Sequence, residues 1–180
     1  MGCQLELLVC LLAVFVRTTH SQSEGCSEVD LVFSLDGTTS VDWNLMRRFV
    51  DSVNLGLDVD SGRARVGVSV FTDAVANPIL INTVRDSQNL RDLVLNLPKP
   101  RESSITNIQG AIESARTTQF NTLGDRPSVP NVLVLLTDGA ASTTQNELVN
   151  AARLAWQDDI RIIPIGIGSN VRNEEITGIA

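Results

Sequence analysis

Histidine, cysteine and lysine are scarce in this chain of 180 residues. It contains one histidine, three cysteines and, at Lys99, a single lysine. The formal net charge is −7, from 21 acidic residues against 14 basic ones, and Arg47 and Arg48 form the only adjacent basic pair. A positive stripe that could follow a phosphate backbone is therefore missing, and we expect no nucleic-acid partner.

The N-terminal segment differs from the rest of the chain. An apolar run from Leu5 to Val16, interrupted only by Glu6, is too short to span a bilayer and is followed by small and polar residues up to Ser23. This pattern predicts a secretory signal peptide over residues 1–23, cleaved after Ser21 or Ser23, although its start lacks the usual Lys or Arg. Because no second long apolar run follows, we expect residues 24–180 to form a secreted domain with no membrane span.

Removal of residues 1–23 would leave Cys26 as the only cysteine and no histidine, because Cys3, Cys10 and His20 lie in that segment. A Ser-His-Asp triad, a Cys-His pair and a histidine zinc site are then excluded within the remaining residues. In an oxidising compartment a single exposed cysteine is a liability, so Cys26 is expected to pair with a cysteine that this chain does not contain. A free or buried thiol is the alternative.

The spacing of apolar residues predicts strands that alternate with helices in one globular domain. Strands are expected at Val29–Leu35, Arg65–Phe71, Ile79–Ile81, Asn131–Leu136 and Ile160–Ile167. Helices are expected at Val41–Leu57, at Ser87–Leu97, after a cap at Thr106 or Asn107, after a capping box of Thr144 and Glu147, and from Asn173. The buried stripes of the first two helices should include Leu45 and Leu93.

The order of these elements predicts the fold class. The second and third strands are close enough in sequence to form an antiparallel hairpin. The remaining strands alternate with helices, which is typical of a doubly wound, mostly parallel α/β sheet with helices on both faces. Pro164 in the last strand marks an edge or a bulge, because proline has no N–H for the strand ladder.

A polar loop, Asp36-Gly37-Thr38-Thr39-Ser40, joins the first strand to the first helix. The chain turns at Gly37, so that the hydroxyls of Thr38 and Ser40 lie beside the carboxylate of Asp36. Magnesium and calcium prefer oxygen ligands, and one acid with two hydroxyls supplies half of a site for such a cation. The alternative is that Ser40 only caps the helix and Asp36 only shapes the turn.

Two further residues are expected at the same edge of the sheet. Ligands of doubly wound sheets bind at the carboxyl ends of the strands, where the winding direction reverses. Asp138 follows the most strongly apolar strand and Thr106 stands at the head of a helix, so both can join Asp36 if the first and fourth strands are neighbours. An ordinary turn around Asp138 and a simple helix cap at Thr106 are the alternatives.

Three separated segments, Val29 to Ser40, Thr106 to Ile112 and Val132 to Gly139, together resemble a von Willebrand factor A-type domain. In that family a metal-ion-dependent adhesion site has an Asp-x-Ser-x-Ser first loop, a Thr in a second loop and an Asp in a third. The residues that match these positions one by one are Asp36, Thr38, Ser40, Thr106 and Asp138. Thr38 replaces the first Ser of the pattern, which keeps the hydroxyl oxygen and adds a methyl group.

The resemblance also implies structural features. The family's sheet has the order 3-2-1-4-5-6 with strand 3 antiparallel, and its last strand and helix would lie beyond the point where this chain ends. Residues 24–180 are therefore expected to be a C-terminally incomplete domain of order 3-2-1-4-5. A cysteine after the family's last helix often pairs with one just before the first strand, which would give Cys26 a partner beyond Ala180. The expected metal is Mg²⁺, or else Mn²⁺ or Ca²⁺.

The function implied by the resemblance is binding, not catalysis. Two carboxylates and three hydroxyls leave a divalent cation under-neutralised and under-coordinated, so an acidic side chain of a partner can complete its shell. The implied partner is an extracellular matrix protein, with collagen first. The chain would then be part of a matrilin-like or invertebrate extracellular matrix protein with further domains.

Two other functions stay open from the sequence. A metal-independent structural spacer would keep the fold and need no cation. A magnesium-dependent phosphatase of the haloacid dehalogenase type would use Asp36 as its nucleophile, but Thr38 stands where the second acid of that enzyme class is expected.

Overall fold

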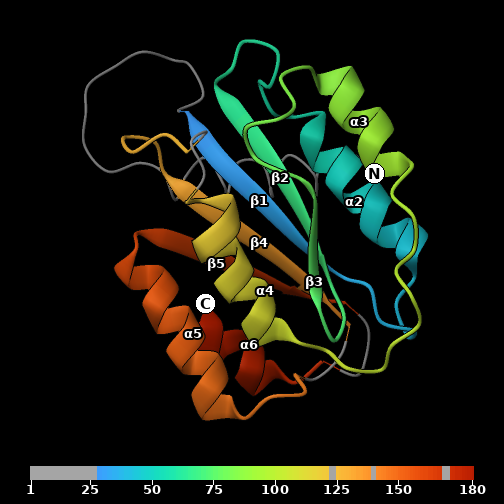
Figure 1. Cartoon of the computed structure of the whole chain (residues 1–180), viewed down its shortest axis with the longest axis vertical. Coiled ribbons are helices and arrows are strands. Elements are labelled where there is room, and N and C mark those ends of the chain that lie inside the picture. Colours follow the sequence, from blue (N-terminus) through green and yellow to red (C-terminus); the bar gives the residue numbers. More distant parts are fainter. Residues whose placement is uncertain (1–27, 122–124, 139–140, 168–170) are drawn as a thin grey trace.

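A computed structural model describes residues 28–121, 125–138, 141–167 and 171–180. Within them, the strands are β1 (Val29–Asp36), β2 (Ala64–Phe71), β3 (Val75–Ile79), β4 (Asn131–Thr137) and β5 (Ile160–Gly166). They form one sheet of order β3-β2-β1-β4-β5, in which β3 runs antiparallel to β2 and the other neighbours are parallel (Figure 1). The predicted fold class and strand order are confirmed.

Some expectations fall outside these residues. The predicted signal peptide over residues 1–23, Cys26 and Gly139 all lie in segments that the structure does not describe. The cleavage point, the pairing of Cys26 and the incomplete C-terminus of the domain therefore stay predictions.

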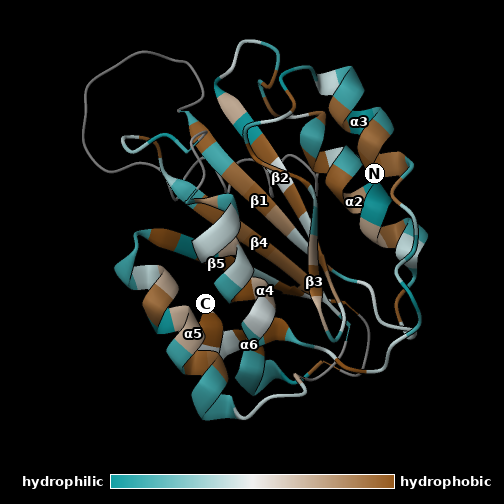
Figure 2. Ribbon diagram, in the orientation of Figure 1, coloured by the Kyte–Doolittle hydropathy of each residue, from teal (hydrophilic) through white to brown (hydrophobic). Residues whose placement is uncertain are grey.

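Helices cover both faces of the sheet (Figure 1). One face packs against α2 (Trp43–Asn54) and α3 (Ser87–Leu95). The other packs against α4 (Ile108–Ser114) with its π-helical continuation η1 (Ala115–Gln119), and against α5 (Gln145–Gln157) and α6 (Asn173–Ile179). Strands β1 and β4 are mostly hydrophobic because both of their faces are covered (Figure 2). No helix in the described part of the chain is long and apolar enough to cross a membrane.

Helix α2 begins later than predicted, because Asp42 and not Ser40 is its N-cap. The Asp42 carboxylate accepts hydrogen bonds from the main-chain N–H groups of Asn44 at 3.0 Å and Leu45 at 3.1 Å. The helix also ends at Asn54 instead of Leu57. Its buried apolar side chains are Trp43, Met46, Val50 and Val53, whereas Leu45 is 47% exposed. The buried face of α2 therefore differs from the predicted apolar stripe, because it does not include Leu45.

The β2–β3 hairpin is antiparallel as predicted, but its second strand comes earlier. Strand β3 comprises Val75–Ile79 and not Ile79–Ile81, because the turn is so tight that Phe71 already pairs with Val75. At the other end of the sheet, Pro164 lies in β5, which has one strand neighbour among the described residues, so the edge prediction is confirmed. Strand β5 ends at Gly166, one residue before the predicted Ile167.

The helix caps decide one alternative left open by the sequence and confirm one prediction. Asn107, and not Thr106, caps α4, since its side-chain oxygen accepts a hydrogen bond from the N–H of Gly110 at 2.8 Å. The capping box of Thr144 and Glu147 at the start of α5 is confirmed. Helix α3 ends at Leu95 instead of Leu97, and Leu93, expected in its buried stripe, is 43% exposed.

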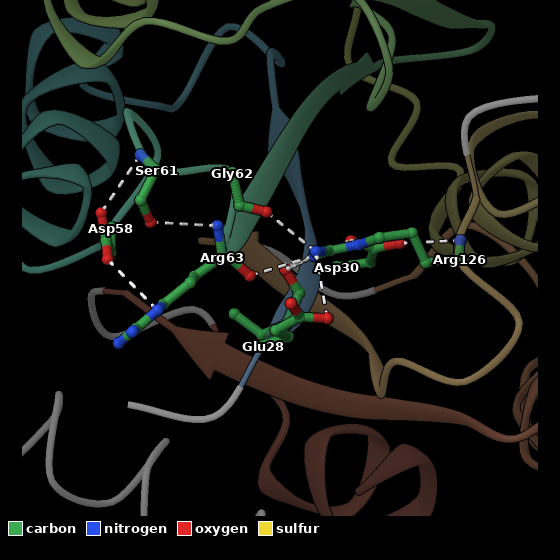
Figure 3. Close-up of polar contacts among 8 residues, drawn as sticks. Glu28, Asp30, Asp58, Ser61, Gly62, Arg63 and Arg126 are labelled. Carbon is green, nitrogen blue, oxygen red and sulfur yellow. Dashed lines mark hydrogen bonds and ion pairs between the residues drawn. The ribbon is translucent and has the colours of Figure 1, made fainter. Parts of the chain in front are cut away.

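A buried ion pair holds the amino-terminal end of β1 (Figure 3). Asp30 is 0% exposed and accepts hydrogen bonds from the Arg126 main-chain N–H at 3.1 Å and from Arg126 Nε at 2.8 Å. The guanidinium also donates to the main-chain carbonyls of Val29 (2.9 Å), Gly62 (2.8 Å) and Arg63 (3.0 Å). Arg126 therefore fastens the segment before β4 to β1 and to the turn before β2.

Candidate metal centre

Asp36 is the last residue of β1, and its carboxylate is completely buried. One oxygen, Oδ1, accepts hydrogen bonds from the main-chain N–H of Thr38 at 2.9 Å and from Thr38 Oγ1 at 2.7 Å. The other, Oδ2, accepts from Thr137 Oγ1 at 2.7 Å, and Thr137 is the last residue of the neighbouring strand β4. The predicted convergence of Asp36 and Thr38 is therefore present.

Ser40 links this first loop to Asp138. Its hydroxyl donates to Asp138 Oδ1 at 3.0 Å and lies 3.4 Å from Thr38 Oγ1. The contact joins residues that are 98 positions apart in sequence, and it exists because β1 and β4 are parallel neighbours, with Leu35 in register with Leu136. Asp36, Thr38, Ser40 and Asp138 thus meet at the carboxyl ends of the adjacent strands β1 and β4.

Thr106 lies next to the third loop and joins the site through its main chain. Its side chain is buried, with 6% exposure. The Thr106 N–H donates to Ser142 Oγ at 2.9 Å, and the Ser142 N–H donates to the Thr106 carbonyl at 3.0 Å. This reciprocal pair of hydrogen bonds fixes the second loop against the segment that follows Asp138. The role of the Thr106 hydroxyl as a ligand stays a prediction.

The first loop is also packed tightly against the loop that precedes Thr106. The Thr39 N–H donates to the Ser103 carbonyl at 3.0 Å, and the Gly37 N–H donates to the Phe71 carbonyl at 2.8 Å. A Cβ atom on Gly37 would lie only 2.4 Å from Pro100 Cγ. Glycine is therefore needed at position 37 because a larger side chain would not fit. Its backbone conformation is not the reason: among the described glycines, the positive φ that only glycine adopts readily is found at Gly62.

Gly37→Ala is expected to destabilise the fold by about 1–3 kcal/mol, because the added methyl group must push Pro100 away from the first loop. Urea denaturation of the variant and the unchanged chain measures this difference. Thr39→Ala, at an exposed position of the same loop, is the control and should change the stability by less than about 0.5 kcal/mol. Equal denaturation midpoints for Gly37→Ala and the unchanged chain would contradict the packing argument.

The negative charge of Asp36 acts on the carboxyl of Asp138. Burial raises the pKa of the Asp138 carboxyl, and the nearby negative charge of Asp36 raises that pKa further, while the hydrogen bond from Ser40 opposes the rise. A divalent cation between the two acids would remove this repulsion, because it interacts favourably with both charges.

The donor set suits a hard cation. All five predicted ligands offer oxygen, which is the ligand atom that Mg²⁺, Mn²⁺ and Ca²⁺ prefer. In the described ranges, no group of three or more His, Cys, Asp or Glu side chains is placed to hold a metal ion. A cation at this site would therefore depend on the three hydroxyls as well as on the two acids.

Sequence reasoning missed two residues that shape the site. Thr137 is not singled out in the sequence analysis, although its hydroxyl donates a hydrogen bond to Asp36 Oδ2. Ser142 was not singled out at all, and it braces Thr106 from 36 positions away. The position of Thr137 next to Asp138 at the end of a buried strand was an available signal. For Ser142 the sequence contains no local signal, because its partner lies on another loop.

Comparison with known proteins identifies the family of this chain. Residues 30–180 match the family model of the von Willebrand factor type A domain, and the chain belongs to this family. The family expected from the sequence is confirmed.

Individual relatives place the chain more finely. It is similar to matrilin-1 of Gallus gallus (26% identity over 152 residues) and to the collagen alpha-6(VI) chain of Mus musculus (30% identity over 160 residues). These alignments cover 82% and 85% of this chain but only 30% and 7% of those relatives, so it spans a small part of their length.

Solved structures show the same fold. Proximal thread matrix protein 1 from the mussel byssus superimposes with a TM-score of 0.77 and 21% identity, over 86% of this chain and 41% of that one. The manganese-loaded TRAP protein of Plasmodium vivax gives a TM-score of 0.73 and 19% identity, over 86% of this chain and 63% of that one. At these identities the comparison supports the fold and carries no residue roles.

Proposed function

We propose that this protein is a secreted, non-enzymatic adhesion module of the extracellular matrix that holds a divalent cation at Asp36, Thr38, Ser40, Thr106 and Asp138. The observation that carries the proposal is the hydrogen bond from Ser40 to Asp138 at 3.0 Å, which brings the first and third loops together at the switch point of the sheet. Its support from relatives is the similarity to a matrilin and to a collagen VI chain.

The cation would supply a positive charge that an acidic group of a partner can reach. Asp36 is buried and keeps its hydrogen bonds to Thr38 and Thr137, so its part is to orient the first loop and to contribute negative charge. Ser40 is exposed and lies on the open side of the site. Mg²⁺ and Mn²⁺ are the proposed ions. Among solved structures of the same fold, one of the mussel byssus protein is described as having a zinc-occupied metal-ion-dependent adhesion site (MIDAS) motif, and that of the TRAP protein is described as manganese-loaded.

Collagen is the proposed partner, bound through one of its acidic side chains, and the extracellular matrix is the proposed location. The test is binding of the protein to immobilised collagen with Mn²⁺ or with EDTA. Binding that requires Mn²⁺ is expected. Binding of equal strength in EDTA would contradict cation-mediated adhesion, and absence of binding in both would exclude collagen as the partner.

One observation favours a metal-independent spacer as the second candidate function. Both oxygens of Asp36 have hydrogen-bond partners within the protein, so the carboxylate is satisfied without a cation. In that case the loops would be held for stability alone. Substitutions that remove a ligand oxygen would then leave every binding measurement unchanged.

Substitutions of Thr38 distinguish the adhesion module from the spacer, because Thr38→Val removes the hydroxyl at nearly constant side-chain volume. Thr38→Ser keeps the hydroxyl and should leave the Mn²⁺ affinity within about threefold of that of the unchanged chain. Thr38→Val removes a proposed ligand oxygen and should weaken Mn²⁺ binding by at least about tenfold, because loss of a residue outside the coordination shell already costs about 10- to 100-fold. Titration calorimetry measures both affinities. Thr39→Val removes an exposed hydroxyl one residue further on and is the matched control. If Thr38→Val binds Mn²⁺ as well as the unchanged chain, then Thr38 is not a ligand.

A further inference from the structure

Glu175 on α6 is a buried acid that the proposed metal site does not use directly. Its side chain is only 9% exposed, whereas its neighbour Glu174 is exposed. Oε2 accepts a hydrogen bond from the main-chain N–H of Ala141 at 2.8 Å, and Oε1 accepts one from Arg172 Nη1 at 3.2 Å. Hydrogen bonds to an ionised carboxylate are among the stronger ones in proteins, so this contact is a firm attachment point for Ala141.

Ala141 belongs to the segment that follows Asp138 and leads into α5. The next residue, Ser142, exchanges two hydrogen bonds with the main chain of Thr106. A continuous set of contacts therefore runs from α6 through Ala141 and Ser142 to the second loop of the site.

We propose that Glu175 is a positioning residue for the metal site: it holds Ala141 by its main-chain N–H, and so fixes the adjacent Ser142 and, through it, Thr106. The inference rests on the proposed function, because it concerns the same cation. Partners that orient metal ligands from outside the coordination shell typically contribute about 10- to 100-fold to metal affinity. Arg172 supports this role by holding the second oxygen of Glu175.

The test compares Mn²⁺ affinities of four forms of the full chain by titration calorimetry. Glu175→Ala removes the acceptor of the Ala141 N–H and should weaken Mn²⁺ binding about tenfold. Glu175→Gln replaces the carboxylate with an amide whose oxygen can still accept the hydrogen bond from Ala141. Its Mn²⁺ affinity should stay within about threefold of that of the unchanged chain. Glu174→Ala, on the exposed neighbour, should have no effect. An unchanged Mn²⁺ affinity in Glu175→Ala would overturn the inference, even if that variant melts at a lower temperature.

A second measurement needs no substitution. If the Glu175–Ala141 contact favours the arrangement that binds metal, then by linkage the metal must favour the contact. Saturating Mg²⁺ should therefore slow hydrogen exchange at the amide of Ala141, and an unchanged exchange rate would overturn the inference. Failure of the unchanged chain to bind any divalent cation would instead overturn the proposed function, and this inference with it.

Discussion

Asp138→Ala is expected to abolish binding of Mg²⁺ and Mn²⁺. The proposed site has only two carboxylates, so the substitution would remove half of its negative charge and one of its five proposed oxygen ligands. It also removes the acceptor of the Ser40 hydroxyl, which is the contact that joins the first and third loops. Titration calorimetry with MnCl₂ on the unchanged chain and the variant measures the loss.

Asp73→Ala is the matched control for this substitution. Asp73 is an exposed acid just beyond the carboxyl end of β2, at the same edge of the sheet, and its carboxylate accepts a hydrogen bond from Thr72 Oγ1 at 2.9 Å. If specific ligands hold the metal, the Mn²⁺ affinity of Asp73→Ala should stay within about twofold of that of the unchanged chain. Equal affinities of Asp138→Ala and the unchanged chain would contradict the assignment, and equal losses in both variants would indicate general attraction to a negative surface.

Asp30→Ala is expected to lower the free energy of unfolding by about 3–5 kcal/mol, because the Arg126 guanidinium loses its buried carboxylate and keeps only the exposed carboxylate of Glu28 at 3.5 Å. The carbonyl groups of Val29, Gly62 and Arg63 still accept hydrogen bonds from Arg126, which favours the lower end of this range (Figure 3). Urea denaturation monitored by circular dichroism measures the change.

An exposed ion pair provides the comparison. Arg116 Nη1 and Asp158 Oδ2 are 3.0 Å apart, and the Asp158 side chain is 51% exposed. Asp158→Ala should cost less than about 1 kcal/mol, because water replaces the lost partner. Since Asp30 lies at the opposite end of β1 from Asp36, Mn²⁺ affinity of folded Asp30→Ala should be unchanged. A similar cost for both substitutions would contradict the role given to the buried pair.

The parts of the fold that could be predicted are those encoded locally. The unbroken apolar run of β4 and the capping box at Thr144 and Glu147 depend on neighbouring residues, and both were found where expected. The placement of Asp36 and Asp138 followed from a general property of parallel sheets and required only that β1 and β4 be adjacent.

The parts that could not be predicted depend on contacts between distant residues. The π-helix η1 ends at Gln119, whose buried side chain accepts a hydrogen bond from the Ile81 N–H at 3.0 Å and donates to the Ile79 carbonyl at 3.1 Å. Apolar periodicity carries no information about such a contact across about 40 residues. The contacts around the site could not be predicted for the same reason. The hydrogen bonds between Ser142 and Thr106, and the one from Ala141 to Glu175, form only in the folded chain.

One divalent cation is expected to bind where the first, second and third loops meet. Mn²⁺ is paramagnetic and broadens the NMR signals of nearby nuclei, so a titration of the isotope-labelled chain locates the ion directly. The amide signals of Thr38, Ser40, Thr106 and Asp138 are expected to broaden first, while those of Asp30 and Arg126 at the other end of the sheet stay sharp. Selective broadening elsewhere in the chain, or none at stoichiometric Mn²⁺, would contradict it.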